Sequence, residues 1–295
     1  MGRGQQTKIR GVEQSIICGD CLHELTRIKR DSIDLILTSP PYAGKRSGIP
    51  FNYQYVSWFL QRSAQFKRVL KPSGSFVLNI KEGVTNGQRE IYVMELILEL
   101  IRKQDWIWTE EYIWHKPNAF PGKWSNRFRD AWERCLHFTK EKRFNMYQDA
   151  VRRPVKDWAI SRLKNLSDED MKRHESATKS GFGRNVSHWK GRKLVYPDNV
   201  IELAGETGNK QHDAVFPIGL PSWFIKLFTK EGDLVLDPFA GSGTTCVAAK
   251  KLGRSCLGID IDPKSCEIAR QRVATTAEAS SSSLGGIRQS PRSTR

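Results

Sequence analysis

The sequence has no long hydrophobic run, because no stretch of 18 or more apolar residues occurs among its 295 residues. A membrane-spanning helix needs about 20 such residues, so neither a membrane span nor a membrane partner is expected. The amino-terminal residues, MGRGQQTKIRG, also lack the apolar core of a secretory signal. Both absences favour a cytoplasmic protein over a membrane-bound or exported one.

Patterns typical of metal sites and of disulfide frameworks are also missing. The chain has only six cysteines, spread along its length, which is typical of an intracellular protein with reduced thiols. Cys18-Gly-Asp-Cys21 has the spacing of a zinc or redox pair, but no second CxxC accompanies it, so a structural role is favoured. The histidines have neither HxxxH nor HExxH spacing, and no metal is expected.

Acidic residues are too few to balance the basic ones. The chain has 48 Lys and Arg against 32 Asp and Glu, a net charge of +16 and a pI of about 9.7. Residues 116–196 alone hold 20 Lys and Arg against 9 Asp and Glu, a surplus of +11. Such concentrated positive charge predicts a polyanionic partner, with nucleic acid as the first candidate.

Strands and helices alternate on both sides of this basic segment. Such alternation predicts an α/β fold with a mostly parallel sheet covered on both faces. In the helix at 88–103, Ile91, Met94, Leu98 and Ile101 share one face. The predicted strands are 33–38, 75–80, 106–114, 200–203, 233–238 and 255–261, and the predicted helices lie between residue 52 and the turn at 71–74, at 88–103, at about 219–230 and 243–252, and from Pro263.

A glycine-rich turn follows one of these strands. In the segment Asp237-Pro-Phe-Ala-Gly-Ser-Gly-Thr-Thr245, a strand runs through glycines into a helix, which lets a ligand approach bare backbone. Asp260 ends the next strand, 17 residues after Gly243, where a carboxylate can accept hydrogen bonds from both hydroxyls of a ribose. The lysine of a Walker phosphate loop and the GxGxxG of nicotinamide sites are absent. The segment therefore predicts a different nucleoside cofactor.

Two segments together resemble the signature motifs of a known family. DPFAGSGTT at 237–245 and TSPPY at 38–42 are similar to the paired motifs of S-adenosylmethionine-dependent amino-methyltransferases of DNA. Their order, with TSPPY first, a variable basic region next and the glycines near the carboxyl terminus, resembles the permuted β group. The resemblance covers residues 16–274 and implies a Rossmann-like, doubly wound class I methyltransferase fold with S-adenosyl-L-methionine as cofactor.

The resemblance also implies which residues hold that cofactor. The glycine motif would surround its methionine part, and Asp260 would bind its ribose. Asp20 lies in a segment that resembles the family's acidic motif near the adenine, which explains CGDC better than zinc does. A looser segment, 211–217, resembles an element that lines the same pocket. The expected cofactor residues are Asp20, Thr38, His212, Phe216, Asp237, Phe239, Gly241, Ser242, Gly243, Thr244 and Asp260.

The turn Ser39-Pro40-Pro41-Tyr42 suits methyl transfer to an exocyclic amine of a base. Such an amine is a poor nucleophile because its lone pair is delocalised, so hydrogen-bond acceptors must align it with the activated methyl group. The Ser39 hydroxyl and the Pro40 carbonyl are the candidate acceptors, while both prolines set the backbone direction. Tyr42 offers a ring for stacking a base that has been rotated out of the duplex. The alternative is a plain strand-ending turn.

Alternatives are open both for the base that is methylated and for the class of molecule that accepts the methyl group. In the resembling family, serine at the first motif position goes mostly with cytosine N4 and aspartate mostly with adenine N6. Cytosine N4 is therefore preferred here, with adenine N6 as the nearest alternative. Methylation at cytosine C5 needs a cysteine nucleophile, and none of the six cysteines follows a proline. A DNA-binding protein with a vestigial cofactor site and a methyltransferase of RNA or protein are more distant rivals.

The basic segment 116–196 occupies the place of the family's variable target-recognition region. Double-stranded DNA is accordingly the expected partner, held mainly through phosphates. Lys45 and Arg46, beside the catalytic turn, are either phosphate contacts or solvated loop charges. The same choice, between DNA contacts and ordinary surface or core residues, holds for Arg127, Arg129, Arg152, Arg153, Arg184, Arg192, Trp124, Trp132, Trp158 and Trp189.

The resulting domain organisation has four parts: a catalytic half at 1–115, the recognition insert at 116–196, a cofactor-binding half at 197–274 and a disordered tail at 275–295. The resemblance further implies a bacterial or archaeal protein associated with the nucleoid, as a monomer or homodimer. A cognate restriction endonuclease is a further expected partner, although a solo enzyme would have the same sequence features.

Overall fold

The computed structural model describes residues 14–44, 48–49, 52–119, 122–155, 161, 164, 191–205 and 216–277. Several predicted features lie outside these residues: His212, Lys45, Arg46, Arg184, Trp158, Trp189, the side chain of Trp124 and the tail from residue 278 on. The chain forms two compact units, one of residues 1–147 with 199–295 and one of residues 148–198.

The first unit is built on an eight-stranded sheet with the order β1-β14-β13-β2-β3-β9-β6-β12. All neighbouring pairs are parallel except those of β9, which runs antiparallel to both β3 and β6. The predicted doubly wound, mostly parallel sheet is therefore confirmed. Its strands are β1 (Gln14–Cys18), β2 (Ile33–Thr38), β3 (Leu70–Ile80), β6 (Ile107–His115), β9 (Trp132–Thr139), β12 (Val200–Glu202), β13 (Leu234–Asp237) and β14 (Ser255–Asp260).

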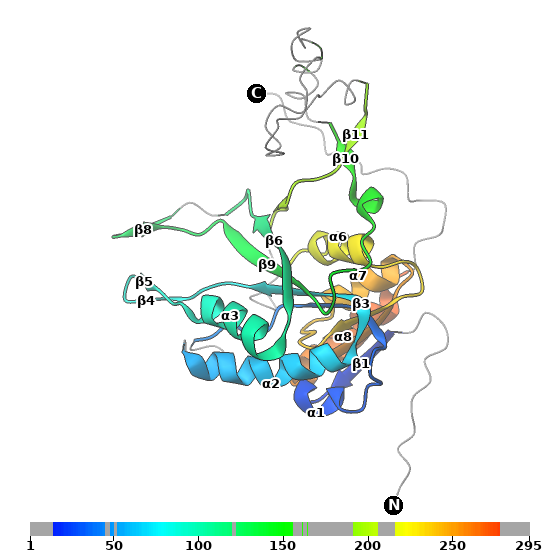
Figure 1. Ribbon diagram of the computed structural model, residues 1–295, viewed down its shortest axis with the longest axis horizontal. Helices are drawn as coiled ribbons and strands as arrows, with labels where there is room; N and C mark the ends of the chain where they lie inside the picture. The colour runs from blue at the N-terminus through cyan, green and yellow to red at the C-terminus, as the bar shows by residue number, and fades with distance from the viewer. Residues whose placement is uncertain are drawn as a thin grey trace, which may run out of the picture. The chain divides into compact units, whose positions relative to one another are not determined.

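Two groups of helices cover the two faces of this sheet (Figure 1). Helix α2 contacts both α1 and α3 in one group, and α7 contacts both α6 and α8 in the other. None of the described helices is long and apolar enough to cross a membrane. The helices are α1 (Cys21–Leu25), α2 (Tyr53–Val69), α3 (Tyr92–Gln104), α6 (Gly219–Phe228), α7 (Thr244–Lys251) and α8 (Pro263–Thr275).

Helix α3 shows which of its two apolar faces packs against the core. Val93, Leu96 and Leu100 are fully buried, together with Tyr92. Ile91, Met94 and Leu98 do share a face, as their spacing predicts, but they are 58%, 54% and 43% exposed. Both sets have helical spacing, so periodicity alone did not distinguish the buried face from the exposed one.

The basic segment 116–196 is divided differently from the prediction. Residues up to Tyr147 belong to the first unit, and β9 lies inside its central sheet, between β3 and β6. An antiparallel strand that pairs with distant partners leaves no α/β alternation in the local sequence. The other described elements of this segment are small: the hairpin of β7 (Lys123–Trp124) with β8 (Arg127–Phe128) in the first unit, and the 3-10 helix η1 (Gln148–Val151) and the pair β10 (Arg153–Pro154) with β11 (Leu194–Val195) in the second. A further hairpin of the first unit, β4 (Val84–Thr85) with β5 (Gln88–Arg89), precedes the segment.

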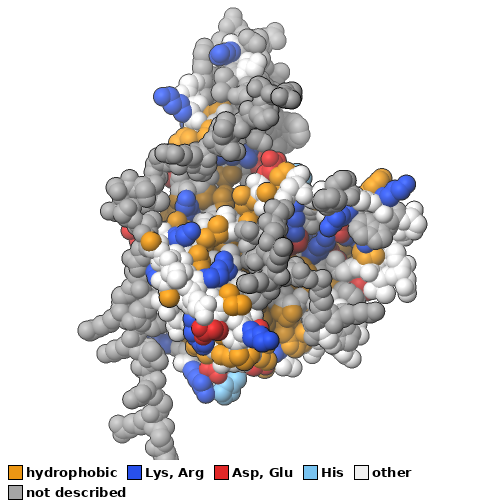
Figure 2. All heavy atoms as spheres, turned by 180° about the vertical axis from the view of Figure 1, so that it is seen from behind, with side chains coloured by type: hydrophobic (Ala, Val, Ile, Leu, Met, Phe, Trp, Pro, Cys, Tyr) orange, Lys and Arg blue, Asp and Glu red, His pale blue; other side chains and the backbone are white. Residues whose placement is uncertain are grey.

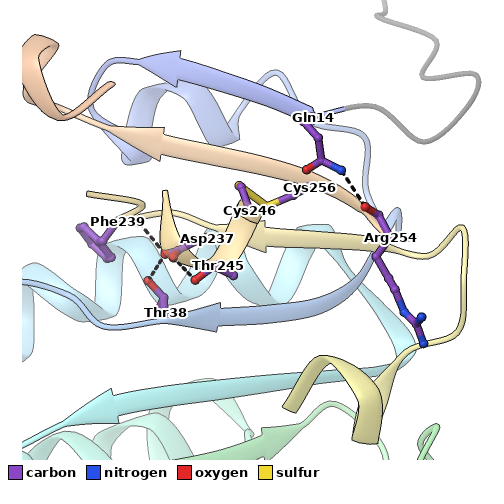
Figure 3. Close-up of a disulfide and its surroundings, with 8 residues drawn as sticks. All are labelled: Gln14, Thr38, Asp237, Phe239, Thr245, Cys246, Arg254 and Cys256. Atoms are coloured by element: carbon purple, nitrogen blue, oxygen red, sulfur yellow. Dashed lines mark hydrogen bonds between the residues drawn. A yellow bond between two sulfur atoms is a disulfide. The ribbon is translucent and has the colours of Figure 1, made fainter. Parts of the chain in front are cut away.

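The prediction that all thiols are reduced is wrong for one pair. Cys246 of α7 and Cys256 of β14 form a disulfide that joins the helix to the strand beside it (Figure 3). Both residues are buried, 0% and 1% exposed. Ten residues separate them in the sequence, and the pairing depends on a tertiary contact that no local motif signals. Cys18, Cys21, Cys135 and Cys266 are free.

Candidate functional site

A cavity of about 600 Å³ opens at the carboxyl ends of β2, β13 and β14. Ligands of open α/β sheets bind at this edge. The catalytic turn and the glycine turn, almost 200 residues apart in the sequence, both contribute to the cavity wall. The predicted residues that line it are Asp20, Ser39, Pro41, Phe216, Asp237, Phe239, Gly241, Ser242, Thr244 and Asp260.

Four predicted residues that the structure describes do not line this cavity. Thr38 is fully buried and Pro40 is buried in the catalytic turn. Gly243 is the residue of the glycine turn that packs against Ala269, and Tyr42 packs against the hydrophobic core. The cavity thus separates residues that face a ligand from residues that shape the two turns.

Asp237 is the buried centre of the glycine turn. One oxygen of its carboxylate accepts from the Thr38 hydroxyl at 2.7 Å and from the Phe239 amide at 3.2 Å, and the other accepts from the Thr245 hydroxyl at 2.6 Å (Figure 3). Burial raises the pKa of this carboxyl to about 6 although all three hydrogen bonds lower it. Asp237 therefore ties β2, β13 and α7 together through a carboxylate that titrates near neutral pH.

The two glycines of the turn have a backbone conformation that few other residues adopt. Gly241 has φ +50° and Gly243 has φ +78°. A Cβ atom on Gly243 would also lie 2.8 Å from the Cβ atom of Ala269 in α8, closer than such atoms approach. Glycine at this position thus lets α7 begin against α8.

Asp260 lies at the end of β14 and reaches back to the glycine turn. Its Oδ2 accepts from the amide of Gly241 at 2.7 Å, and its Oδ1 accepts from the amide of Asp262 at 2.9 Å. The carboxylate is thereby fixed at the cavity wall. Each oxygen has a second lone pair that can accept from a ligand hydroxyl. Ile261, which follows it, lines the cavity and is 71% exposed.

An aromatic and cationic wall, contributed by α2, faces the glycine turn. The ring of Trp58 packs against Phe239 with 5.6 Å between ring centroids, and the guanidinium of Arg62 lies over the Trp58 ring, 4.2 Å from its centroid. Arg62 also donates to both carboxylate oxygens of Asp20, at 3.3 and 3.2 Å. Asp20 is thus held at the cavity, where it also caps α1 through the amide of Leu22.

The catalytic turn is held by a hydrogen-bonded chain of side chains. The Ser39 hydroxyl donates to the Tyr42 hydroxyl at 3.4 Å, and Tyr42 donates to Oε2 of Glu133 at 2.8 Å. The Asn79 amide donates to the same oxygen at 3.2 Å, and Lys116 pairs with the other oxygen. Burial, followed by the charge of Glu133, raises the pKa of Tyr42 well above its usual value, so this tyrosine stays neutral.

Sequence reasoning missed six residues of this site: Trp58, Arg62, Asn79, Glu133, Ile261 and Ile49. The first two come from a helix face and the next two from strands of the sheet, so no short motif contains them. One signal was present for Ile261, because it follows the acid that ends β14. Among the described residues, no group of three or more His, Cys, Asp or Glu side chains is arranged to hold a metal ion.

Comparison with known proteins places this geometry in a family. A family model described as DNA methylase, of the N6 and N4 type, matches residues 33–271. The Type II methyltransferase M.PvuII of Proteus hauseri is 29% identical over 274 residues, covering 85% of this chain and 80% of that protein. The orphan methyltransferase M.BamHII of Bacillus amyloliquefaciens is 28% identical over 255 residues, covering 82% of this chain and 89% of that protein.

Solved structures show the same fold. The PvuII DNA methyltransferase, described as cytosine-N4-specific, superposes with a TM-score of 0.66 at 23% identity and covers 89% of this chain and 88% of that one. The M1.HpyAVI–SAM complex has a TM-score of 0.55 at 20% identity, with 88% of this chain and 98% of that one covered. Because the family model extends from the start of β2 into α8, the protein belongs to the DNA methylase family of N6 and N4 methyltransferases.

Proposed function

We propose that this protein transfers a methyl group from S-adenosylmethionine to the N4 amine of cytosine in duplex DNA, at a specific sequence. The single observation that carries the proposal is the shared cavity. Ser39, at the end of β2, lines the same space as the glycine turn and Asp260. An amine acceptor and a nucleoside-binding carboxylate therefore meet at one site.

The cavity residues fit S-adenosylmethionine in size and chemistry. A cavity of about 600 Å³ lies within the range of small-molecule sites. Asp260 would accept hydrogen bonds from the ribose hydroxyls of the cofactor, and the exposed side chain of Ile261 would pack against its adenine. Asp237 supplies negative charge near the methionine part, which carries an ammonium and a sulfonium. When bound, the cofactor supplies a methyl group that is already activated by positively charged sulfur.

Ser39 is an acceptor for the target amine because its own proton is already engaged. Its hydroxyl donates to Tyr42, so its lone pairs point away from Tyr42 and can accept an amine proton. The Pro40 carbonyl serves as a second acceptor. Together they orient the amine and let its nitrogen become more tetrahedral as it attacks the methyl carbon. Tyr42 lies outside the lining of the cofactor cavity, and in this proposal the extruded base stacks on the part of its ring that is exposed.

Cytosine is favoured over adenine as the target base. Serine at position 39 supports this choice, and the PvuII enzyme, which has the same fold, is described as cytosine-N4-specific. Both amines need only acceptors around nitrogen, so adenine N6 remains the second candidate function. Its specific support is the family model, which includes N6 enzymes.

Duplex DNA contacts the paired hairpins that leave the carboxyl edge of the sheet. The β4–β5 and β7–β8 hairpins are joined by the Asn126 amide, which donates to the Gly87 carbonyl at 3.2 Å. The second hairpin and its flanks, residues 116–130, hold four basic residues against one acid, Asp130. The basic residues are Lys116, Lys123, Arg127 and Arg129. Lys and Arg side chains lie beside hydrophobic ones on this projecting arm (Figure 2). Phe128, 84% exposed, is suited to stack on a base rather than to fill a core.

The basic unit 148–198 adds further phosphate contacts in this proposal, with Arg152, Arg153 and Arg192 among its described residues. The enzyme is assigned to the cytoplasm of a bacterial cell, where it works near the nucleoid as a monomer or homodimer. A cognate restriction endonuclease is a further proposed partner, because the relatives include Type II methyltransferases.

Transfer of a radiolabelled methyl group tests the acceptor class. Unmethylated duplex DNA, total RNA and a protein mixture are incubated separately with the enzyme and S-adenosylmethionine tritiated in its methyl group. We expect label in duplex DNA alone. Label in RNA or protein with none in DNA would overturn the proposal, and so would binding of DNA without any transfer. Asp260→Ala serves as the control that lacks the ribose-binding carboxylate.

A further inference from the structure

The carboxylate of Glu133 accepts hydrogen bonds from side chains of three different segments of the chain. It lies at the start of β9, its side chain is 13% exposed, and three side chains direct donors at it: Tyr42, Asn79 and Lys116. Lys116 pairs with this carboxylate and balances its charge at a position that little water reaches. This anion is connected to Ser39 through one intervening hydroxyl.

We propose that Glu133 is the final acceptor of the proton that the target amine loses, and that Tyr42 and Ser39 relay it. This inference rests on the proposed function, and it assigns Glu133 and Tyr42 positions in a proton path that no motif indicates. Ser39 touches the amine in this scheme, whereas Glu133 acts through Tyr42.

The proton balance of the step is complete. The amine nitrogen forms its bond to the methyl carbon, the carbon–sulfur bond breaks, and its electron pair stays on sulfur as a neutral thioether. The nitrogen then gives a proton to Oγ of Ser39, Ser39 gives its proton to the Tyr42 hydroxyl, and Tyr42 gives its own to Oε2 of Glu133. Glu133 ends as a neutral acid and later releases the proton to water.

The observed directions of donation agree with this path. Ser39 donates to Tyr42 at 3.4 Å, and the Tyr42 hydroxyl has two acceptors, Oε2 of Glu133 at 2.8 Å and Oδ1 of Asn79 at 3.3 Å, of which Glu133 is the nearer. Catalytic hydrogen bonds are often long before substrate is bound, and the Ser39–Tyr42 contact would shorten as a base fills the site. Because burial keeps Tyr42 neutral, it can pass a proton along but does not store negative charge.

A relay is needed because the flipped base excludes water from the amine. A base stacked on Tyr42 and hydrogen-bonded to Ser39 leaves the protein's own groups as the nearest proton acceptors. Of these, Ser39 and the Pro40 carbonyl are weak bases, and a carboxylate two hydrogen bonds away is a much stronger one. The anion of Glu133 also stabilises the positive charge that develops on the amine nitrogen.

Single-turnover methyl transfer at saturating cofactor tests the relay in four variants. Glu133→Gln and Tyr42→Phe each keep the shape of the side chain and break the chain at one point. We expect each to slow transfer roughly 100-fold, in the range of general base catalysis, while the Kd for S-adenosylmethionine stays within about twofold. The double variant should be no slower than the slower single variant, because one path is already broken.

Glu111→Gln is the matched control, since Glu111 lies on the neighbouring strand and pairs with Arg134 outside the chain. It should transfer at the wild-type rate. The solvent deuterium isotope effect adds a readout that altered packing does not move: wild type should show one, and Glu133→Gln should show a smaller one. Thermal unfolding of each variant identifies any that fail to fold.

The possible failures can be distinguished. A wild-type protein that methylates no DNA would overturn the proposed function and this inference with it. A wild-type protein that methylates DNA, with Tyr42→Phe equally fast, would overturn the relay alone and leave Tyr42 only a stacking surface. A folded Glu133→Gln variant with unchanged transfer would do the same for Glu133.

Discussion

Ser39 and Asp260 occupy the ends of different strands, β2 and β14, and face one cavity from opposite motifs. Their proposed roles are separable, because Ser39 is assigned to the target amine and Asp260 to the ribose of the cofactor. Strand β13, whose last residue is Asp237, lies between these two strands in the sheet. Single substitutions at these two positions are therefore expected to change methyl transfer and cofactor affinity separately.

Ser39→Ala removes an acceptor for the amine and leaves the cofactor wall intact. We expect kcat to fall by roughly 10- to 1000-fold, because orientation of the nucleophile is lost, while the Kd for S-adenosylmethionine changes little. Steady-state kinetics and calorimetry of the same preparation measure the two quantities. A loss of cofactor affinity as large as the loss of turnover would show that Ser39 holds the cofactor instead.

Asp237 predicts a pH dependence of cofactor binding. Burial raises its pKa to about 6 in the free protein, and a bound cation favours the ionised form, which lowers that pKa. Affinity for S-adenosylmethionine should therefore be full above pH 6 and fall as the pH is lowered through about 6, by up to about tenfold per pH unit. Calorimetry between pH 5 and 8 measures it. Asp237→Asn should bind weakly with no such slope, and a wild-type Kd constant across this range would contradict the assignment.

At the scale of elements, the packing of α7 against α8 depends on a bare glycine. Helix α7 begins directly after Gly243, and the neighbouring Ala269 leaves no room for a side chain. In the adjoining turn, the amide of Gly241 donates to Asp260 and so fixes that carboxylate at the cavity wall. Stability and cofactor binding are therefore coupled through one backbone position.

Gly243→Ala should lower the free energy of unfolding by about 2–4 kcal/mol, from the positive φ together with the clash. Gly232→Ala is the matched control, since Gly232 has φ +83° but its added Cβ atom would meet nothing within 4 Å. It should lose only about 1–2 kcal/mol. Urea unfolding measures both, and equal losses would exclude the contact with Ala269 as a cause.

Some of these elements could be predicted from the sequence, and the reason is local. Strand β2 is followed directly by Ser-Pro-Pro and β13 by the glycine turn, so each strand and its end can be predicted from fewer than about ten neighbouring residues. Because parallel strands have their carboxyl ends at the same edge of the sheet, the two turns are expected to lie at that edge. Strand β9, Arg62 and Glu133 could not be predicted, because each acts through partners far along the chain: β9 pairs with β3, Arg62 bonds Asp20, and Glu133 bonds Tyr42. The Cys246–Cys256 disulfide belongs with them.

At the scale of the whole molecule, most of the positive charge and the lining of the cofactor cavity belong to different parts of the chain. Of the net charge of +16, residues 116–196 account for +11, while the cofactor cavity contains acids such as Asp20, Asp237 and Asp260. This division predicts that salt acts on DNA binding far more than on cofactor binding. Phosphate contacts release counterions, whereas a small zwitterionic ligand releases few.

The logarithm of the DNA association constant should fall linearly with the logarithm of salt concentration, with a slope of about −5 to −9 for 6 to 10 phosphate contacts. Fluorescence anisotropy on a labelled duplex between 50 and 200 mM salt, about the range over which such contacts are lost, measures it. The Kd for S-adenosylmethionine, measured in the same buffers, should vary little. A DNA slope near zero would exclude phosphate contacts by the basic segment.

The identity of the methylated nucleoside tests the central claim most directly, since it requires the two turns to work as one site on one atom. Unmethylated duplex DNA of mixed sequence is incubated with the enzyme and S-adenosylmethionine deuterated in its methyl group, then digested to nucleosides and analysed by mass spectrometry. We expect labelled N4-methyldeoxycytidine as the product. Labelled N6-methyldeoxyadenosine would contradict the cytosine assignment, and the absence of any labelled nucleoside at saturating cofactor would contradict the enzyme itself.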